Sequence, residues 1–418
     1  MPEAATADIA GLVREAMIAL GLIILVAKLG GELFGRLGQP PVLGELVAGV
    51  ILGNVSLAGI SVLEPLKTNL AVTAVAEIGV ILLLFEVGLE SDLGQMLEVG
   101  GSALLVACLG VMAPMLLGYF VSVAFLPDYG WQTHLFVGAT LTATSVGITA
   151  RVLKDLGRSD SAEARIILGA AVADDVIGLL VLAVVSGLVT AAAAGGFAFA
   201  PALWIVVKAC LFLAAAVLAG RFLSQRMFLL AARLRVPGVL VALAICFCFL
   251  VAALAGWAGL APIVGAFAAG VVLDPVHYRP FLERGERRVE ELLFPITTLI
   301  APVFFVLMGL RVELRSFASA TVLGFAAVVT LAAVAGKQIC GLGVLERGLN
   351  RIAVGVGMIP RGEVGLIFAG IGSTLLVGPR PVFSPTTYSA LVAMVMVTTF
   401  MTPPLLKLAF GRKRRAAA

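Results

Sequence analysis

Charged residues are scarce in this chain of 418 residues. Asp, Glu, Lys and Arg together make up 13% of the sequence, whereas soluble globular domains carry roughly 25%. Apolar residues reach 61%, which is more than a soluble interior of this size can hide. The low charge also excludes an intrinsically disordered chain, and the 47 glycines follow no three-residue period, which excludes collagen. The remaining class is a polytopic membrane protein.

The apolar residues fall into thirteen stretches, each near the length that a helix needs to cross a bilayer. Alternation with a period of two is absent, which disfavours a transmembrane β-barrel. We therefore predict an all-α polytopic membrane protein with 13 transmembrane helices. The predicted spans are 14–37, 42–60, 69–89, 98–126, 132–153, 163–190, 199–222, 236–256, 258–274, 290–310, 319–343, 350–376 and 386–408.

The basic residues are distributed unevenly between the two sides of these spans. Of the 29 Lys and Arg residues, 20 fall in connectors on one side, 5 on the other and 4 within spans. Because short basic connectors stay in the cytoplasm, the bias predicts an integral plasma (inner) membrane protein with its N-terminus outside and its C-terminus cytoplasmic. The first thirteen residues hold no basic cluster, so no cleaved signal peptide is expected.

Residues that bind metals firmly are also few. The five cysteines all lie in apolar spans without a C-x-x-C pair, so we interpret them as small packing residues and expect no resident metal or cofactor. The two histidines, His134 and His277, are interpreted as solvated side chains at the membrane edges. The small net charge of +4 gives no indication of a nucleic-acid partner.

Two adjacent acids break the apolar pattern at the middle of span 163–190. An ionisable group at the bilayer centre costs about 2.5–3.5 kcal/mol on insertion scales. Asp174 and Asp175 therefore indicate a function. Neighbours on a helix point about 100° apart, so one carboxylate can pair with a buried cation while the other faces an aqueous cavity.

Three lysines fall within predicted spans and are candidates for that cation. Lys337 lies inside span 319–343 and is the preferred partner. Lys28 has Glu32 four residues later and is interpreted as half of a snorkelling surface pair. Lys208 receives no assignment.

Two spans carry sequences that interrupt a helix. Span 132–153 has a central polar cluster from Thr142 to Ser145, and span 350–376 contains MIPRGEVG with Pro360 at its centre. Unwound backbone at membrane depth is tolerated where it lines a cavity or is buried in protein, and paired interrupted spans mark the substrate site of secondary transporters. Arg361 and Glu363 are placed to neutralise the partial charges of the broken helix ends. Ordinary Ser/Thr packing between helices is the alternative for the first cluster.

The order of the spans also fits two inverted six-helix repeats with discontinuous crossing helices. If span 199–222 is a linker, the first six spans match the last six, and the odd shift of seven inverts their topology. The two interrupted spans are equivalent under this shift.

Six segments resemble the cation/proton antiporter superfamily, and within it the electrogenic NapA-type sodium/proton branch. They are PPVLGELVAGVILGN (40–54), LTATSVGITARVL (141–153), AAVADDVIG (170–178), GLAPIVGAFAAGVVL (259–273), Lys337 and GMIPRGEVGLIFAG (357–370). Their order along nearly the whole chain makes the resemblance specific, although a lone DD pair is weak.

The resemblance implies a homodimer in which each protomer has a scaffold and a moving core. The scaffold and dimerisation helices would be 14–89 and 236–310, the core ion-translocation helices 98–190 and 319–408, and the linker helix 199–222. By the same likeness Asp175 is the ion-binding carboxylate, Asp174 pairs with Lys337, and Thr144 and Ser145 lie near the ion. Sodium would bind transiently at Asp175 and Asp174.

The predicted function is that of a secondary active antiporter rather than an enzyme. It would exchange sodium or lithium for protons by alternating access and electrogenically. Its partners would be membrane lipid, a second copy of the chain, and the monovalent cations and protons that it transports. A potassium/proton antiporter on the same fold is the nearest alternative, and a sodium-coupled organic anion symporter is another. An intramembrane protease is disfavoured because its two acids must face each other across a gap, and no filter motif suggests a channel.

Overall fold

The computed structural model describes residues 2–58, 64–90, 100–158, 161–193, 199–234, 236–273, 275–377 and 379–411. Within these ranges some side chains are left aside, among them those of Lys208, His277 and Glu363. The predictions for these three side chains therefore lie outside the described part of the chain.

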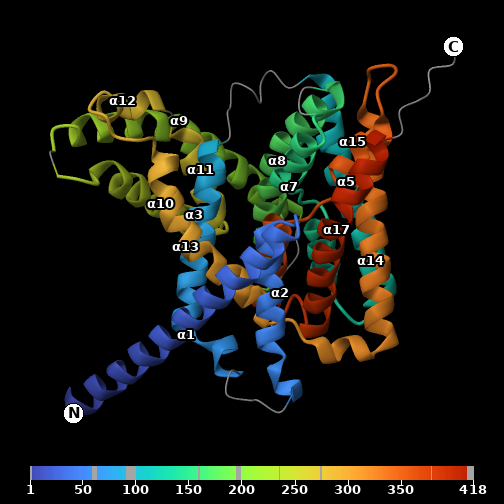
Figure 1. Cartoon of the computed structure of the whole chain (residues 1–418), viewed down its shortest axis with the longest axis horizontal. Helices are drawn as coiled ribbons and strands as arrows, with labels where there is room; N and C mark the ends of the chain where they lie inside the picture. The colour runs from blue at the N-terminus through green and yellow to red at the C-terminus, as the bar shows by residue number, and fades with distance from the viewer. Residues whose placement is uncertain are drawn as a thin grey trace. The chain divides into compact units, whose positions relative to one another are not determined.

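The chain forms two compact units, each built from two separate stretches of sequence (Figure 1). Unit 1 comprises Met1–Ser91 and Leu211–Leu314, and unit 2 comprises Asp92–Cys210 and Arg315–Ala418. Helix α9 (Phe199–Ala231) has residues in both units.

The described secondary structure of unit 1 is entirely helical. Its α-helices are α1 (Pro2–Arg36), α2 (Pro41–Gly53), α3 (Leu70–Glu90), α10 (Val239–Trp257), α11 (Pro262–Val272), α12 (Arg279–Leu282) and α13 (Val289–Leu310). Short 3-10 turns are η1 (Val55–Ala58), η2 (Glu64–Thr68) and η3 (Pro275–Tyr278).

Unit 2 is also mainly helical. Its helices are α5 (Gly101–Phe125), α6 (Trp131–Thr140), α7 (Val146–Asp155), α8 (Ala162–Ala193), α14 (Ala320–Ile339), α15 (Arg351–Gly357), α16 (Glu363–Thr374) and α17 (Pro385–Gly411), with 3-10 turn η5 (Cys340–Gly343). The 3-10 turn η4 (Leu314–Ala318) begins at the boundary between the units. A minor departure from an all-α chain is the antiparallel pair β1 (Leu376–Val377) and β2 (Arg380–Pro381).

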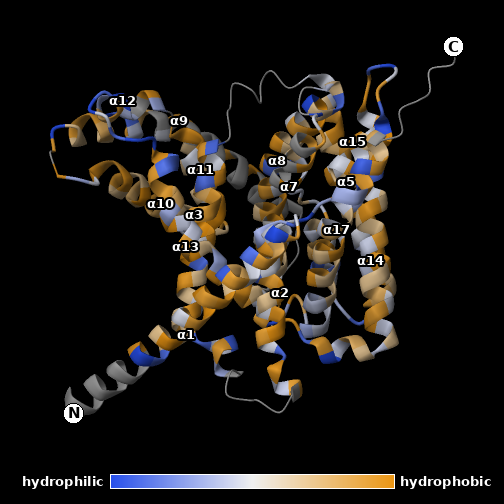
Figure 2. Cartoon of the chain, in the orientation of Figure 1, coloured by the Kyte–Doolittle hydropathy of each residue, from blue (hydrophilic) through white to orange (hydrophobic). Residues whose placement is uncertain are grey.

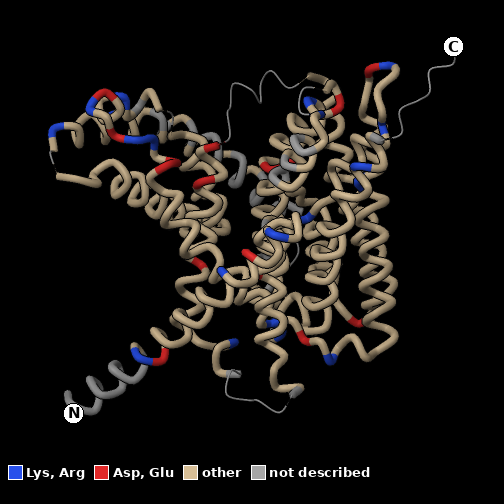
Figure 3. The backbone as a smooth tube through the Cα atoms, viewed as in Figure 1, with Lys and Arg blue, Asp and Glu red and all other residues tan. Residues whose placement is uncertain are grey.

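The described helices have the length and composition of membrane spans. Eight are long and apolar enough to cross a bilayer, and three further apolar helices are 10–17 residues long. Figure 2 shows that apolar residues dominate these helices, and Figure 3 shows most of the charged residues at connectors and helix ends. The structure thus supports a helical membrane protein, while the number of thirteen crossings stays a prediction.

Glycines allow the helices of unit 1 to pack backbone against backbone. A Cβ on Gly44 of α2 would collide with the Gly30 carbonyl of α1. On the other side of α2, a Cβ on Gly49 or Gly53 would meet the backbone of α13. Gly88 of α3 meets α11 in the same way. Since association in lipid depends on close van der Waals packing rather than on hydrophobic burial, these glycines set the spacing of the helices.

Both interrupted spans contain a break in unit 2, as the sequence indicates. The first is divided between α6 and α7 at residues 141–145, and the second between α15 and α16 at residues 358–362. Pro360 explains the second break, because it lacks an N–H group and its ring clashes with the preceding turn. The first break contains neither proline nor glycine, and Thr142 instead donates from Oγ1 to the Ala139 carbonyl at 2.8 Å.

Candidate ion-binding site in unit 2

Asp174 of α8 and Lys337 of α14 form a buried ion pair. The Lys337 Nζ lies 3.0 Å from Asp174 Oδ1, and the two side chains are 0% and 1% exposed respectively. The other carboxylate oxygen, Asp174 Oδ2, is buried and has no hydrogen-bond partner among the described residues. One oxygen of Asp174 is thus committed to Lys337 and the other is open to a further partner.

Asp175 follows on the same helix but has a different environment. Its side chain is partly exposed, whereas that of Asp174 is buried. Adjacent helical residues point about 100° apart, so the two carboxylates reach different surroundings. The sequence predicts this difference.

The two breaks meet through their backbones. The Ser145 N–H donates to the Pro360 carbonyl at 2.8 Å, and Thr144 Oγ1 donates to the Met358 carbonyl at 3.4 Å. Gly362 lies so close to Ser145 that a Cβ there would collide with the Ser145 hydroxyl. Thr144 and Ser145 are both 2% exposed, so the crossing is buried in protein. Interrupted backbone at membrane depth requires such burial.

Arg361 binds backbone carbonyls in the break that follows α6. Its Nη1 donates to the Ala143 carbonyl at 2.6 Å and lies 3.5 Å from the Thr142 carbonyl, while Nη2 donates to the Ala333 carbonyl of α14 at 3.1 Å. The C-terminal end of a helix carries a partial negative charge, so a cation is favourable there. The Glu363 side chain lies outside the described part of the chain.

Three charged groups therefore share one buried region of unit 2. Asp174, Lys337 and Arg361 are each at most 1% exposed, and Arg361 interacts electrostatically with both Asp174 and Lys337. Two cations thus act on a single buried carboxylate. A second negative charge at Asp175 would make the set of four groups neutral.

Sequence reasoning missed one hydroxyl at the crossing. Thr149 of α7 is 1% exposed, and its Oγ1 donates to the Gly357 carbonyl at 2.6 Å. This carbonyl lies in the last turn of α15 and loses its helical partner at the break. The sequence did contain a signal for this residue: Thr149 follows Ser145 by four positions, one helical turn, and so extends the polar cluster on the same face.

Two predictions made for single residues are wrong. Lys28 does not pair with Glu32: its Nζ donates to the Thr298 carbonyl of α13 at 2.6 Å, and Glu32 instead accepts from Arg36 at 2.8 Å. His134 is not solvated. It is 6% exposed, and its Nδ1 lies 2.9 Å from Ser122 Oγ of α5.

Interrupted helices are typical of secondary transporters, and paired charges buried at membrane depth mark ion pathways. The model of the family "Sodium/hydrogen exchanger, transmembrane" matches residues 21–408. The chain belongs to this family of membrane transporters, and so to the cation/proton antiporter superfamily.

Individual relatives agree with the family. The chain is 37% identical to the high-affinity Na(+)/H(+) antiporter NhaS3 of Synechocystis sp., with 96% of this chain and 91% of the relative covered. It is 33% identical to the Na(+)/H(+)-K(+) antiporter GerN of Bacillus cereus, with 96% and 98% covered. Its fold is similar to that of the sodium proton antiporter MjNhaP1 from Methanocaldococcus jannaschii, with a TM-score of 0.72, 15% identity, and 96% and 97% of the two chains covered.

Proposed function

We propose that this protein exchanges sodium, or lithium, for protons across a membrane. The observation that carries the proposal is the buried pair of Asp174 and Lys337, with the partly exposed Asp175 next to it on α8. The family and the names of the relatives agree with this assignment.

The exchange follows from competition at one carboxylate. Asp175 binds either a proton or a partly dehydrated cation, because both neutralise the same charge. Thr144, Ser145 and backbone carbonyls at the crossing supply the hard oxygen ligands that sodium and lithium prefer. Asp174 keeps Lys337 charged while the pair is intact, and loss of that pair releases the lysine proton.

The charge balance makes the exchange electrogenic. Two protons moving against one monovalent cation carry net charge, so transport responds to voltage by about 2.3 kcal/mol per charge per 100 mV. Arg361, within the break, and Glu363, at the start of α16, neutralise the partial charges of the broken helix ends.

The two units have different roles in the proposed cycle. The helices at 14–89 and 236–310 form the scaffold and the homodimer interface, and those at 98–190 and 319–408 form the moving core. The 199–222 segment of α9 links them. The core, which contains the second half of each inverted repeat, moves to give alternating access. The protein lies in the plasma membrane with its N-terminus outside and its C-terminus cytoplasmic.

The test is transport by the purified protein in proteoliposomes. We expect Asp175→Asn to abolish cation-dependent proton movement, because the amide binds neither ion at this site. Asp128→Asn, in the connector between α5 and α6, is the matched control and keeps wild-type transport. Wild-type exchange by Asp175→Asn would refute the site assignment.

A potassium/proton antiporter is the second candidate. The observation that favours it is the similarity to GerN, whose name includes potassium as well as sodium. Parallel measurements with Na⁺, Li⁺ and K⁺ separate the two. Proton movement driven by K⁺ as strongly as by Na⁺ would assign the protein to the potassium class.

A further inference from the structure

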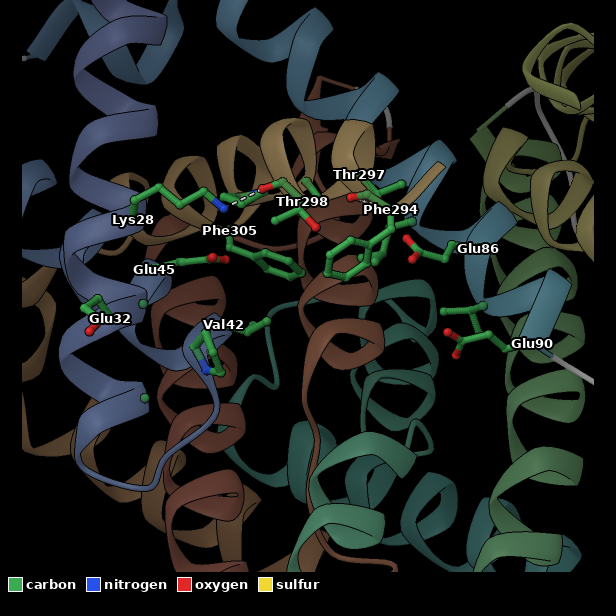
Figure 4. A pocket seen from close by; sticks show the side chains of 17 residues that line it. Lys28, Glu32, Val42, Glu45, Glu86, Glu90, Phe294, Thr297, Thr298 and Phe305 are labelled. Carbon is green, nitrogen blue, oxygen red and sulfur yellow. Dashed lines mark hydrogen bonds between the residues drawn. The ribbon is translucent and has the colours of Figure 1, made fainter. Parts of the chain in front are cut away.

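Unit 1 contains a cavity of about 630 Å³ that the proposed exchange does not use. It lies among α1, α2, α3 and α13 and is drawn in Figure 4. Its charged lining consists of Glu32, Glu45, Glu86, Glu90 and Lys28. Carboxylates thus outnumber cations four to one.

Glu45 is the unusual member of this set. Its side chain is 7% exposed, and it accepts no hydrogen bond from the described residues. Figure 4 shows its carboxylate pointing into the cavity, towards the ring of Phe305. A buried carboxylate without a hydrogen-bond donor is costly, and a positively charged group bound beside it would offset that cost.

Lys28 does not fully supply this positive charge, because its ammonium group already donates a hydrogen bond to a backbone carbonyl. Pro302 of α13 lacks an N–H group and so leaves the carbonyl four residues earlier, that of Thr298, without its helical donor. Lys28 Nζ supplies this donor at 2.6 Å. Lys28 attracts Glu45 electrostatically, but no ion pair forms between them within 4.0 Å.

Glu32 is likewise committed, but to a partner outside the cavity lining. It is paired with Arg36 at 2.8 Å, and Figure 4 shows it directed away from the phenyl rings. The carboxylates that face a ligand are therefore Glu45 on one side and Glu86 and Glu90 on the other, of which Glu86 also accepts a side-chain hydrogen bond from Thr297.

Two aromatic rings lie between these carboxylates. Figure 4 shows Phe305 near Glu45 and Phe294 near Glu86. A carboxylate beside the face of an aromatic ring is the combination that recognises an organic ammonium or guanidinium group. The volume falls in the range of sites for small organic molecules, and a bare metal ion would fill little of it.

We propose that this cavity binds an amphipathic organic cation, a protonated amine or guanidinium joined to an apolar ring. The cationic group lies against Glu45, and the apolar part packs on Phe305 and Phe294. The site is formed by unit 1 alone and does not involve Asp174 or Asp175.

The experiment measures binding of 1-naphthylmethylammonium to the purified full-length protein by fluorescence titration, with thermal unfolding as a second readout. Its neutral analogue, 1-naphthalenemethanol, has the same ring without the charge. We expect Glu45→Gln to weaken binding of the cation at least tenfold, and Phe305→Leu to weaken it several-fold. Glu283→Gln is the matched control, because Glu283 lies in unit 1 outside the cavity and is paired with Arg279.

The outcomes separate this proposal from the proposed transport. Asp175→Asn is expected to bind the cation with wild-type affinity even though it does not exchange ions. Equal binding of the neutral analogue, or unchanged binding by a folded Glu45→Gln, would overturn the cation site. Loss of binding in Asp175→Asn would place the ligand in unit 2 instead. If Glu45→Gln does not fold, Glu86→Gln is measured in its place with the same criteria.

Discussion

Lys337 and Asp174 form an ion pair of opposite charges that is buried from solvent. Their side chains are 0% and 1% exposed, so removal of Lys337 leaves the Asp174 carboxylate buried without its ion-pair partner, with only the electrostatic attraction of Arg361 remaining. We expect Lys337→Met to destabilise the protein by about 3–5 kcal/mol. The double variant Asp174→Asn/Lys337→Met should recover most of this loss, because it removes both charges. The measurement is the thermal unfolding midpoint in detergent.

Lys407→Met provides the control for this comparison. Lys407 lies on α17 and is exposed, so its replacement should change the midpoint little. A double variant as unstable as Lys337→Met would show that the loss does not come from the unpaired charge of Asp174.

Glu346 gives a pH dependence outside the membrane spans. Ser102 Oγ donates to Glu346 Oε2 at 2.6 Å, and this hydrogen bond lowers the pKa of the Glu346 carboxyl below its ordinary value of 4.5. A carboxylate with a lowered pKa in the folded state stabilises the protein above the ordinary value, and this contribution is lost as the pH falls through the folded pKa. We therefore expect Ser102→Ala to lose less stability than the wild type between about pH 6 and pH 3.

The thermal midpoint measured across this pH range tests the prediction. Glu346→Gln removes the titrating group itself and should show the same shallower slope. An unchanged slope in both variants would mean that this hydrogen bond contributes nothing to the acid response.

At the site, sequence reasoning could identify the residue types but not all of their partners. Acids or a lysine in the middle of an apolar span are conspicuous because they cost free energy in lipid, which is why Asp174, Asp175 and Lys337 could be named. Thr149 was missed because a hydroxyl in an apolar span is inexpensive and its acceptor, the Gly357 carbonyl, becomes available only where α15 ends.

At the scale of elements, the contact between α1 and α13 depends on a proline. Lys28 donates to the carbonyl that Pro302 leaves without a donor. This hydrogen bond is exposed, so we expect Lys28→Met to destabilise the protein by about 0.5–1.5 kcal/mol, the net contribution of a typical hydrogen bond. In a Pro302→Ala background the restored N–H can donate to Thr298, so the same replacement should cost much less.

A double-mutant cycle of thermal midpoints measures this coupling. Arg14→Met, an exposed replacement on the same helix, is the control and should be additive with Pro302→Ala. If Lys28→Met costs the same in both backgrounds, the proline is not the reason for the contact.

The helix ends were predictable to within a few residues where apolar composition changes abruptly, as for α3, α8 and α13. The break at Pro360 was predictable because the residue itself forbids a regular helix. The partner of Lys28 was not predictable from local spacing, since the choice between Glu32 and a carbonyl 270 positions away depends on tertiary packing.

At the scale of the whole molecule, the basic connectors predict an orientation that can be measured directly. Helix α13 has 22 residues, about 33 Å at 1.5 Å per residue, which is enough to cross the hydrocarbon core. Arg284 and Arg315 lie beyond its two ends and are both exposed. In a cysteine-free background we expect a membrane-impermeant maleimide to label Arg315→Cys in intact cells and Arg284→Cys only in everted vesicles.

The two variants serve as each other's control. The side of the membrane from which one cysteine is labelled is the side from which the other is expected to be inaccessible. The opposite labelling pattern would reverse the predicted topology. Labelling of both from one side would mean that α13 does not cross the membrane.

The class of protein could be predicted from composition, and the family from six short segments in order, since membrane solvation and ion chemistry restrict residue types strongly. The division into two units could not be derived from composition or spacing. The division depends on which helices, distant in sequence, pack against one another. Small residues such as glycine mark the close contacts, but their partners lie far along the chain and cannot be identified from the sequence.

Helix α2 meets α1 through Gly44 and Gly30 on one side and α13 through Gly49, Gly53 and Gly309 on the other. Contacts between bare backbones leave no flexible side chain to absorb a displacement, so none of the three helices can slip along its neighbour without a steric clash. The trio should therefore behave as a single stiff frame. It carries Lys28, Glu45 and Phe305, whose mutual spacing should consequently stay constant throughout a turnover, however far other helices travel.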